Sequence, residues 1–452
     1  MSFTKSLFQI FIIAALLRTL FAFGFLGAMP LTADALSYAN DALDFLKNFS
    51  PERFFFWPPG NSLLIALFYK IFGVSDTAPR ILTILLGALT CILTAILARQ
   101  VFNSERTATI SGWIAAFYPS SIIMAGQATT MQPTLLIMLA LAILLFSSFK
   151  NYRLWKISLI SILLGFGCLI RPSTLSVIGV LIITGLFLLY KNRANTSPYR
   201  RWMWGIPVAT AIIGAIIVPV MNHNAHYGAG WTISTNNELN FLFGNNPYTP
   251  HYKTSHFGQR ALDSLKPEET AYFRKFIRGN QTQLTLKERR AVSQEAWRYI
   301  LKNPHIFALR SLNRIRAFWG PDYAMSRGIQ LFYGLSFTEF LPVVLFEAGG
   351  YVLVMLLAVS SLLFLFKSGW SLEIKLLLLL TASYQLPYII AFSAASYHFP
   401  VMGYMMVFAA FGVEKIMNGH WGEMFLKRRF VIAAIIFLVI QIEYAYFIIR
   451  LA

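Results

Sequence analysis

Long, uninterrupted apolar runs separated by short basic clusters make up most of the chain. A helix needs about 20 consecutive apolar residues to cross a bilayer. Continuous runs, in place of alternating apolar and polar positions, favour helices over a transmembrane β-barrel. We therefore predict an all-α membrane protein, a polytopic helical bundle of about eleven transmembrane helices. The expected spans lie near residues 7–29, 80–99, 107–125, 131–148, 156–171, 173–190, 203–221, 340–366, 375–392, 398–416 and 430–449.

The composition supports lipid as the main solvent of this protein. Of its 452 residues, 57% are hydrophobic and only 13% are charged, whereas soluble domains carry about 25% charged residues. The net charge of +19 comes from Lys and Arg that mostly cluster at the ends of apolar runs, as expected for cytoplasmic loops; an anionic ligand is the alternative explanation. Both cysteines, Cys91 and Cys168, fall within apolar runs, which indicates neither a disulfide framework nor a cysteine metal site.

The basic clusters also orient the predicted bundle. With the N-terminus in the cytoplasm, the clusters that flank alternate spans all lie inside, and the C-terminus and the large loop lie outside. We expect a multi-pass protein of the plasma (inner) membrane, because about eleven spans without long tails suit a prokaryotic cell. The chain then divides into an N-terminal transmembrane module (1–221), a large non-cytoplasmic loop domain (222–339) and C-terminal transmembrane helices (340–452).

Two segments on the predicted outer side are too long to be simple connectors. The first outer loop, residues 30–79, contains an apolar stretch at 63–72 that is too short to span, and we interpret it as a re-entrant or juxtamembrane helix. The large loop has the mixed polarity and turn residues of a small, mainly helical outer domain. Its residues 304–319 have the pattern of a basic amphipathic helix on the outer membrane surface. We expect the function of the protein in these two segments.

The first candidate for chemistry is Asp34, which follows the first span almost immediately. A carboxylate at the membrane boundary is partly desolvated, and a raised pKa suits it to take a proton from an attacking hydroxyl. The alternative is a structural aspartate that caps a short helix over residues 35–48. Asp41 and Asp44 follow on the same helix and are expected to face solvent.

A second motif, Phe54-Phe-Phe-Trp57-Pro58-Pro59-Gly60-Asn61, combines a rigid proline kink with a glycine that lets another backbone approach. Taken alone, it is a turn before the short helix at 63–72. An acidic residue after the first span, followed in the same loop by aromatic-Pro-Pro-Gly and a short apolar helix, resembles the C-type membrane glycosyltransferases. The most similar branch contains the protein O-mannosyltransferases and the lipid A aminoarabinose transferase.

The same resemblance continues along nearly the whole chain. Arg80 opens the second span, and Gly165-Phe-Gly-Cys-Leu-Ile-Arg171-Pro172 is similar to the family's glycine-rich helix that ends in Arg-Pro. Residues 222–247 resemble the start of its large outer loop, and Ser396-Tyr397-His398-Phe399-Pro400 stands where relatives usually carry an Arg-Tyr pair and a proline. The resemblance implies a polyprenyl-phosphate sugar donor and a catalytic Asp34 that acts on the acceptor or organises the site. It also implies Tyr38 and Pro59 as substrate-binding residues near Asp34.

One position departs from the family pattern, because Gln132 stands where a second acidic residue is expected. A neutral amide can hydrogen-bond a substrate hydroxyl but cannot neutralise a divalent cation. The sequence therefore argues against metal dependence, and it predicts no definite cofactor. Four histidines lack carboxylate or cysteine partners in a metal-ligand pattern, and we interpret them as ordinary loop residues: His223, His226, His251 and His256.

Three basic residues are candidates to bind the donor phosphate. Arg171 at the outer end of a span is costly near hydrocarbon unless it pairs with an anion such as a polyprenyl phosphate or diphosphate; snorkelling toward lipid headgroups is the alternative. His398 can complement a phosphate when it is protonated, or it can be a satisfied core histidine. Arg80 is a further candidate, although contact with ordinary headgroups explains it equally well.

These features predict an enzyme that transfers a sugar from a polyprenyl-phosphate donor to a protein, lipid or cell-envelope glycan on the non-cytoplasmic face, with no nucleic-acid partner. A transporter or flippase of a lipid-linked glycan is the first alternative. It predicts ionisable groups well inside the bilayer, not at its outer edge. A non-catalytic envelope assembly subunit is the second alternative, and Gln132 is its best support.

Overall fold

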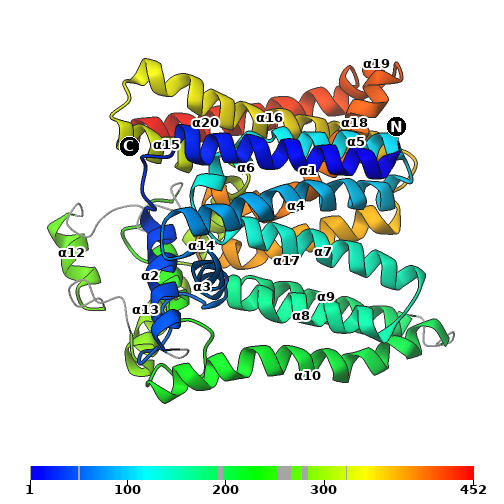
Figure 1. The fold of residues 1–452 in the computed structure, drawn as a ribbon. Coiled ribbons are helices and arrows are strands. Elements are labelled where there is room, and N and C mark those ends of the chain that lie inside the picture. The colour runs from blue at the N-terminus through cyan, green and yellow to red at the C-terminus, as the bar shows by residue number, and fades with distance from the viewer. Residues whose placement is uncertain are drawn as a thin grey trace.

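The chain folds as a bundle of long α-helices with shorter helices gathered at one end (Figure 1). The computed structural model describes residues 2–48, 51–191, 197–251, 266–276, 284–321 and 323–451. All regular secondary structure within these ranges is helical. The predicted all-α, multi-pass membrane architecture is therefore confirmed.

Eleven helices or helix pairs coincide with the predicted spans, but they differ in length and polarity. By length and composition, six in the described part of the chain can cross a bilayer: α1 with η1 (Phe3–Thr19, Leu20–Phe25), α4 (Thr77–Phe102), α7 (Met131–Lys150), α10 (Ser197–His226), α16 (Phe337–Phe366), and η4 with α18 (Ala395–Val401, Met402–Met417). A seventh is the bent pair of α5 (Glu105–Phe117) with α6 and η2 (Pro119–Ile123, Met124–Gly126). The others are α8 (Leu154–Ile170), α9 (Thr174–Lys191), α17 (Leu372–Ile390) and α20 (Arg428–Leu451). The count of about eleven spans thus stays a prediction.

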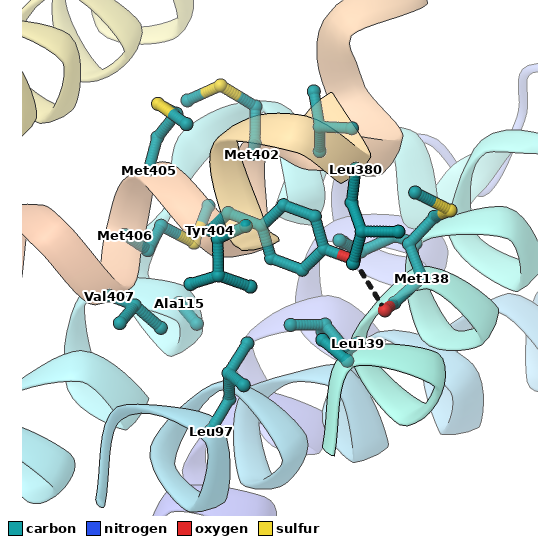
Figure 2. Close-up of a cluster of buried hydrophobic side chains, with 14 of the residues drawn as sticks. Leu97, Ala115, Met138, Leu139, Leu380, Met402, Tyr404, Met405, Met406 and Val407 are labelled. Atoms are coloured by element: carbon teal, nitrogen blue, oxygen red, sulfur yellow. Dashed lines mark hydrogen bonds between the residues drawn. The ribbon is translucent and has the colours of Figure 1, made fainter. Parts of the chain in front are cut away.

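The core of the bundle lies where α4, α5, α7 and α18 pack together (Figure 2). The Tyr404 hydroxyl of α18 donates a hydrogen bond of 2.6 Å to the carbonyl of Met138 on α7. This bond satisfies a buried polar group that water cannot reach. Small residues bring the helices close: a Cβ on Gly112 would come within 2.6 Å of the Ile10 side chain on α1.

The bent span is held by an arginine from the first helix. The axis turns by 52° between α5 and α6, at Pro119, which frees the last carbonyls of α5 from their helical partners. The Arg18 guanidinium donates to two of them, Ala115 and Ala116, and to the Ser121 hydroxyl at 2.8 Å. A fully buried cation in the bundle is therefore compensated by helix-end carbonyls.

Short helices cover the end of the bundle opposite the start of α1, which we call the loop end (Figure 1). The first outer loop contributes α2 (Ala33–Lys47) and α3 (Gly60–Phe72). The large loop domain contributes α11 (Asn237–Gly244), α12 (Pro267–Phe273), α13 (Leu286–Lys302), α14 (Pro304–Phe318) and α15 (Ala324–Tyr333). The predicted short helix at 63–72 is present as part of α3. One further short helix, α19 (Trp421–Phe425), lies at the other end.

Helix α14 has the predicted amphipathic pattern, but its basic side faces the protein. Arg310 and Arg314 are buried, whereas Leu309, Leu312 and Ile315 are exposed. Arg314 donates hydrogen bonds to carbonyls at the ends of α17 and α11, where helices carry partial negative charge. Carbonyls inside the protein therefore bind these two arginines, which do not contribute to the basic outer surface expected from the pattern.

Candidate active site

Asp34 stands at the start of α2, which lies across the loop end of the bundle (Figure 1). Thr32 is the N-cap residue of this helix, and its side chain makes no capping hydrogen bond. The Asp34 carboxylate accepts no hydrogen bond and forms no ion pair with any residue that the structure describes. The helix-capping interpretation of Asp34 therefore lacks its hydrogen bond, and the carboxylate is available to another group.

The surroundings of Asp34 favour its protonated form. The residue keeps an accessible face, yet nearby protein atoms desolvate the carboxyl and raise its pKa above the ordinary value, while the positive charge of Arg171 acts in the opposite direction. A carboxylate with a raised pKa is a stronger base toward a hydroxyl proton. The structure thus brings together Asp34 and Arg171, which are far apart in the sequence.

Arg171 follows the last residue of α8 and is surrounded by neutral hydroxyl and aromatic groups. Its Nε donates to the Thr130 hydroxyl at 2.8 Å, and its Nη1 donates to the hydroxyls of Tyr384 at 3.3 Å and Tyr388 at 3.2 Å. The guanidinium also lies 5.0 Å from the centre of the Tyr397 ring. We call Thr130, Tyr384, Tyr388 and Tyr397 the Arg171 cage. Among the described residues none accepts from Nη2, so this edge of the cation is open to an anion.

Tyr38 connects Asp34 to the Arg171 cage. It lies one helical turn after Asp34 on α2 and is 4% exposed, and its hydroxyl lies beside the Thr130 side chain. Its ring meets Trp57 edge-on, with 5.6 Å between the centroids. Burial raises the pKa of Tyr38, and the nearby Asp34 charge adds to the rise. The Tyr38 hydroxyl consequently keeps its proton and can act as a hydrogen-bond donor.

The Pro-Pro-Gly motif supports this site from behind. Pro59 is buried and precedes α3, and Gly60 begins the helix directly against the end of α8. A Cβ on residue 60 would come within 2.7 Å of the Leu169 carbonyl, two residues before Arg171. The structure gives Pro59 a place in the scaffold of the site; its predicted contact with substrate stays a prediction.

Two predicted substrate-binding residues lie elsewhere in the bundle. The Arg80 guanidinium donates to the backbone carbonyls of Ala22 and Met29, and so it fixes the end of the first span. The Gln132 amide donates to the hydroxyl of Ser121 at 2.9 Å, beside the buried Arg18. Neither side chain makes a described contact with Asp34 or Arg171. The predicted substrate contacts of Arg80 and Gln132 thus stay predictions, and their described contacts are structural.

His398 is a core residue. It is fully buried, its Nδ1 lies 2.7 Å from the Phe318 carbonyl, and its ring stacks on Tyr351 at 4.5 Å. Its burial among aromatic rings favours the alternative of a core histidine, and the phosphate contact of His398 stays a prediction. The residue before it, Tyr397, occupies the place beside Arg171 instead.

Sequence reasoning missed the tyrosines of the cage. Tyr384 and Tyr388 are four residues apart on α17 and therefore share one helix face. Tyrosines near the end of a span are also common at membrane interfaces. The spacing was visible in the sequence, but it did not separate a binding site from an interfacial belt.

The two outer segments of the chain are joined next to this site. The backbone N–H of Phe55 donates to the Asn224 side chain at 2.7 Å, and the Phe55 carbonyl accepts from Thr235 at 3.1 Å. Asp41 and Asp44, which were expected to face solvent, both bind Arg53. These bonds fix the aromatic motif between α2 and the large loop domain.

Among the described residues there is no group of three or more His, Cys, Asp or Glu side chains that suits a metal ion. His223 lies 2.8 Å from the Arg53 carbonyl and stacks on Phe55, which is a structural role. His256 lies outside the described ranges. The Asp34 region accordingly consists of one free carboxylate, one cation and several hydroxyls.

Comparison with known proteins places this arrangement in context. The family model for dolichyl-phosphate-mannose-protein mannosyltransferases matches residues 57–222, a range that includes the aromatic motif and Arg171. The archaeal oligosaccharyltransferase AglB from Archaeoglobus fulgidus, in complex with an inhibitory peptide and a dolichol-phosphate, superposes with a TM-score of 0.51 at 12% identity. That match covers 99% of this chain and 56% of AglB. The chain has the fold of the C-type membrane glycosyltransferases.

Two further solved structures match this chain. The apo Archaeoglobus fulgidus oligosaccharyltransferase gives a TM-score of 0.54 at 13% identity, covering 97% of this chain and 55% of that one. ArnT from Cupriavidus metallidurans bound to undecaprenyl phosphate gives 0.39 at 12% identity, covering 92% and 78%. No curated protein matches the sequence. The chain thus spans little more than half the length of these oligosaccharyltransferases, and the resemblance predicted from its motifs is confirmed.

Proposed function

We propose that this protein is a glycosyltransferase that moves a sugar from a polyprenyl-phosphate donor to an acceptor on the non-cytoplasmic face of the membrane. The observation that carries the proposal is a free carboxylate, Asp34, placed within electrostatic reach of a cation, Arg171, whose described partners are all neutral. A transferase of this kind needs a base for the acceptor and a positive charge for the departing phosphate.

The comparisons support a lipid phosphate as the donor. The matching family is named for dolichyl-phosphate-mannose, and the AglB structure of the same fold holds a dolichol-phosphate. Both are long-chain isoprenoid phosphates. Arg171 suits the phosphate because a guanidinium edge binds phosphate oxygens through directed, charge-assisted hydrogen bonds.

The proposed reaction is a displacement at the anomeric carbon of the donor sugar. An acceptor hydroxyl or amine attacks this carbon, and its proton passes to Asp34. The bond from the anomeric carbon to the phosphate oxygen breaks, and the lipid phosphate leaves with the bonding electrons. Arg171 offsets the charge that develops on the phosphate, and the Tyr38 hydroxyl donates a hydrogen bond near the same point.

The predicted orientation fits this reaction. With the N-terminus in the cytoplasm, the loop end of the bundle faces outward, where nucleotide sugars are not supplied and a membrane-anchored donor is. The apolar carrier then reaches Arg171 from the side, through the lipid. The acceptor, a protein, lipid or cell-envelope glycan, approaches Asp34 from the aqueous side.

The transporter alternative has less support. It predicts ionisable groups along a path through the bilayer, and Arg18 is the arginine that the structure buries in the first span. The Arg18 guanidinium is bound to backbone carbonyls and to Ser121, so Arg18 serves the bend between α5 and α6. Asp34 and Arg171 lie at the loop end instead.

The test uses purified protein and a panel of polyprenyl-phosphate sugars labelled in the sugar. Transfer predicts release of lipid phosphate together with labelled acceptor. Asp34→Asn should lower turnover by roughly a hundredfold or more, whereas Glu52→Gln, at an exposed carboxylate of the same outer loop, should stay near wild type. Movement of intact donor across vesicles without sugar release would support the transporter, and full activity of Asp34→Asn would remove Asp34 from the mechanism.

A further inference from the structure

The backbone that leads into Asp34 is held by a side chain from the next outer segment. The Gln127 amide bonds to it at two points: its Oε1 accepts from the Thr32 N–H at 3.0 Å, and its Nε2 donates to the Pro30 carbonyl at 3.0 Å. Gln127 is 2% exposed. A buried amide that uses both its donor and its acceptor on one short segment fixes the place of that segment closely.

The residue between this clamp and Asp34 is in an unfavourable backbone conformation. Ala33 has a φ of 47°, in the left-handed region that residues with a Cβ rarely adopt. Such a conformation persists only where surrounding contacts impose it, and it occurs often at functional sites. The Gln127 clamp directly precedes Ala33 and can impose this turn, together with Asp76, whose carboxylate accepts from the Leu31 N–H at 3.2 Å.

The same short segment reaches the other half of the site. Three residues after Gln127, the Thr130 hydroxyl accepts from Arg171 Nε at 2.8 Å and lies beside Tyr38. The segment from Gln127 to Thr130 therefore contacts the entry to Asp34 at one end and the Arg171 cage at the other. Its two ends set the position of the carboxylate relative to the cation.

We propose that Gln127 is a positioning residue, which holds Asp34 at the correct place relative to Arg171 by imposing the left-handed turn at Ala33. The proposal rests on the proposed function, since it assigns a role in that reaction. Gln127 touches no reacting atom in this scheme and acts only through Asp34. It is distinct from Gln132, whose amide lies beside Arg18.

The first measurement is the steady-state kinetics of Gln127→Ala with the best donor of the panel. Misplacing a catalytic group by about 1 Å can cost a hundredfold in rate, so we expect turnover to fall at least tenfold. The KM for the donor should stay within about twofold, because the Arg171 cage keeps its own contacts. Gln441→Ala is the matched control: it removes another buried amide that donates to a carbonyl at 3.0 Å, but on α20.

The second measurement is rescue. Glycine adopts a positive φ without strain, so Ala33→Gly lets the turn persist when the clamp is gone. We expect the turnover of the double variant Ala33→Gly/Gln127→Ala to be at least threefold higher than that of Gln127→Ala alone. Because glycine at a positive φ also stabilises the fold, turnover is measured well below the unfolding temperature of each variant, where general destabilisation does not affect it.

The readouts separate the two proposals. Amide hydrogen exchange at Thr32 should become faster in Gln127→Ala, because its acceptor is lost, whether or not the protein transfers sugar. A wild-type protein that releases no lipid phosphate overturns the proposed function and this role with it. An active wild type with unchanged turnover in Gln127→Ala, or with equal losses in Gln127→Ala and Gln441→Ala, overturns the positioning role alone.

Discussion

Gly60 lies directly against the carbonyl of Leu169, so that a Cβ on residue 60 would come within 2.7 Å of that oxygen. This contact joins the start of α3 to the end of α8, two residues before Arg171. The first outer loop thereby sets the position of the phosphate-binding candidate as well as that of Asp34.

Gly60→Ala should therefore displace the end of α8. Overpacking of this kind costs about 1–3 kcal/mol of stability, and we also expect the donor KM to rise as Arg171 moves. Thermal unfolding in detergent and donor titration measure the two effects. Gly214→Ala on α10, where a Cβ would meet no atom within 4 Å, is the control. Equal behaviour of the two variants would show that the contact has no consequence.

The pH dependence of turnover should report the link between Asp34 and Arg171. Asp34 accepts a proton only when ionised, so turnover is present above its pKa and is lost as the pH falls through it. Burial raises this pKa and the Arg171 charge lowers it. Arg171→Gln should thus shift the fall in turnover at low pH to a higher pH, whereas Arg171→Lys should leave it close to its position in the wild type. If turnover falls at the same pH in Arg171→Gln as in the wild type, the Arg171 charge has no effect on the pKa of Asp34.

Tyr388 is the centre of the hydroxyl network in the Arg171 cage. Its hydroxyl accepts from Arg171 at 3.2 Å and donates to Ser173 at 3.1 Å. A lost hydrogen bond of this kind is worth about 0.5–1.5 kcal/mol, so Tyr388→Phe should raise the donor KM roughly two- to tenfold. Tyr404→Phe removes a buried core hydroxyl instead and should lower stability without changing KM. The same KM in wild type and Tyr388→Phe would argue against donor binding at the cage.

Arg314 should be essential for attaching α14 to the ends of α17 and α11. It donates to the carbonyls of Ile389, Ile390 and Gly244, and removing one partner of such buried groups costs about 2–4 kcal/mol. We expect Arg314→Met to lower the unfolding temperature in detergent clearly. Arg298→Lys on the exposed face of α13 should change stability by less than about 0.5 kcal/mol. A stable Arg314→Met variant would contradict this account.

The sequence was sufficient for the parts of the molecule that depend on local pattern. The apolar runs predicted the helices, and the order of Asp34, the Pro-Pro-Gly motif and Arg171 indicated a common region. The orientation of α14 was not accessible in the same way. An amphipathic pattern shows that two faces differ, but a membrane protein can turn the apolar face outward when helix ends inside bind its arginines.

The remaining contacts of the site could be identified only from the three-dimensional structure. Asp41 and Asp44 have no sequence feature that assigns them to Arg53, because that pairing depends on how the chain returns after α2. Gln127 and Gln132 are similar in sequence context, yet one binds the segment before Asp34 and the other lies beside Arg18. Contacts between distant segments decide such roles, and periodicity within one segment does not report them.

The outward leucines of α14 also affect the bilayer around the protein. Leu309, Leu312 and Ile315 are exposed on α14, whose Arg314 donates to the Ile389 carbonyl at the end of α17. We expect lipid to cover these three side chains, which would make the apolar surface of the protein taller on this side. A bilayer responds to such a mismatch by local thickening, or the protein responds by tilting. Phe318, the last residue of α14, lies 5.7 Å from the Tyr388 ring. The deformed lipid is therefore expected next to the Arg171 cage, where membrane thickness would influence how easily a long isoprenoid chain approaches.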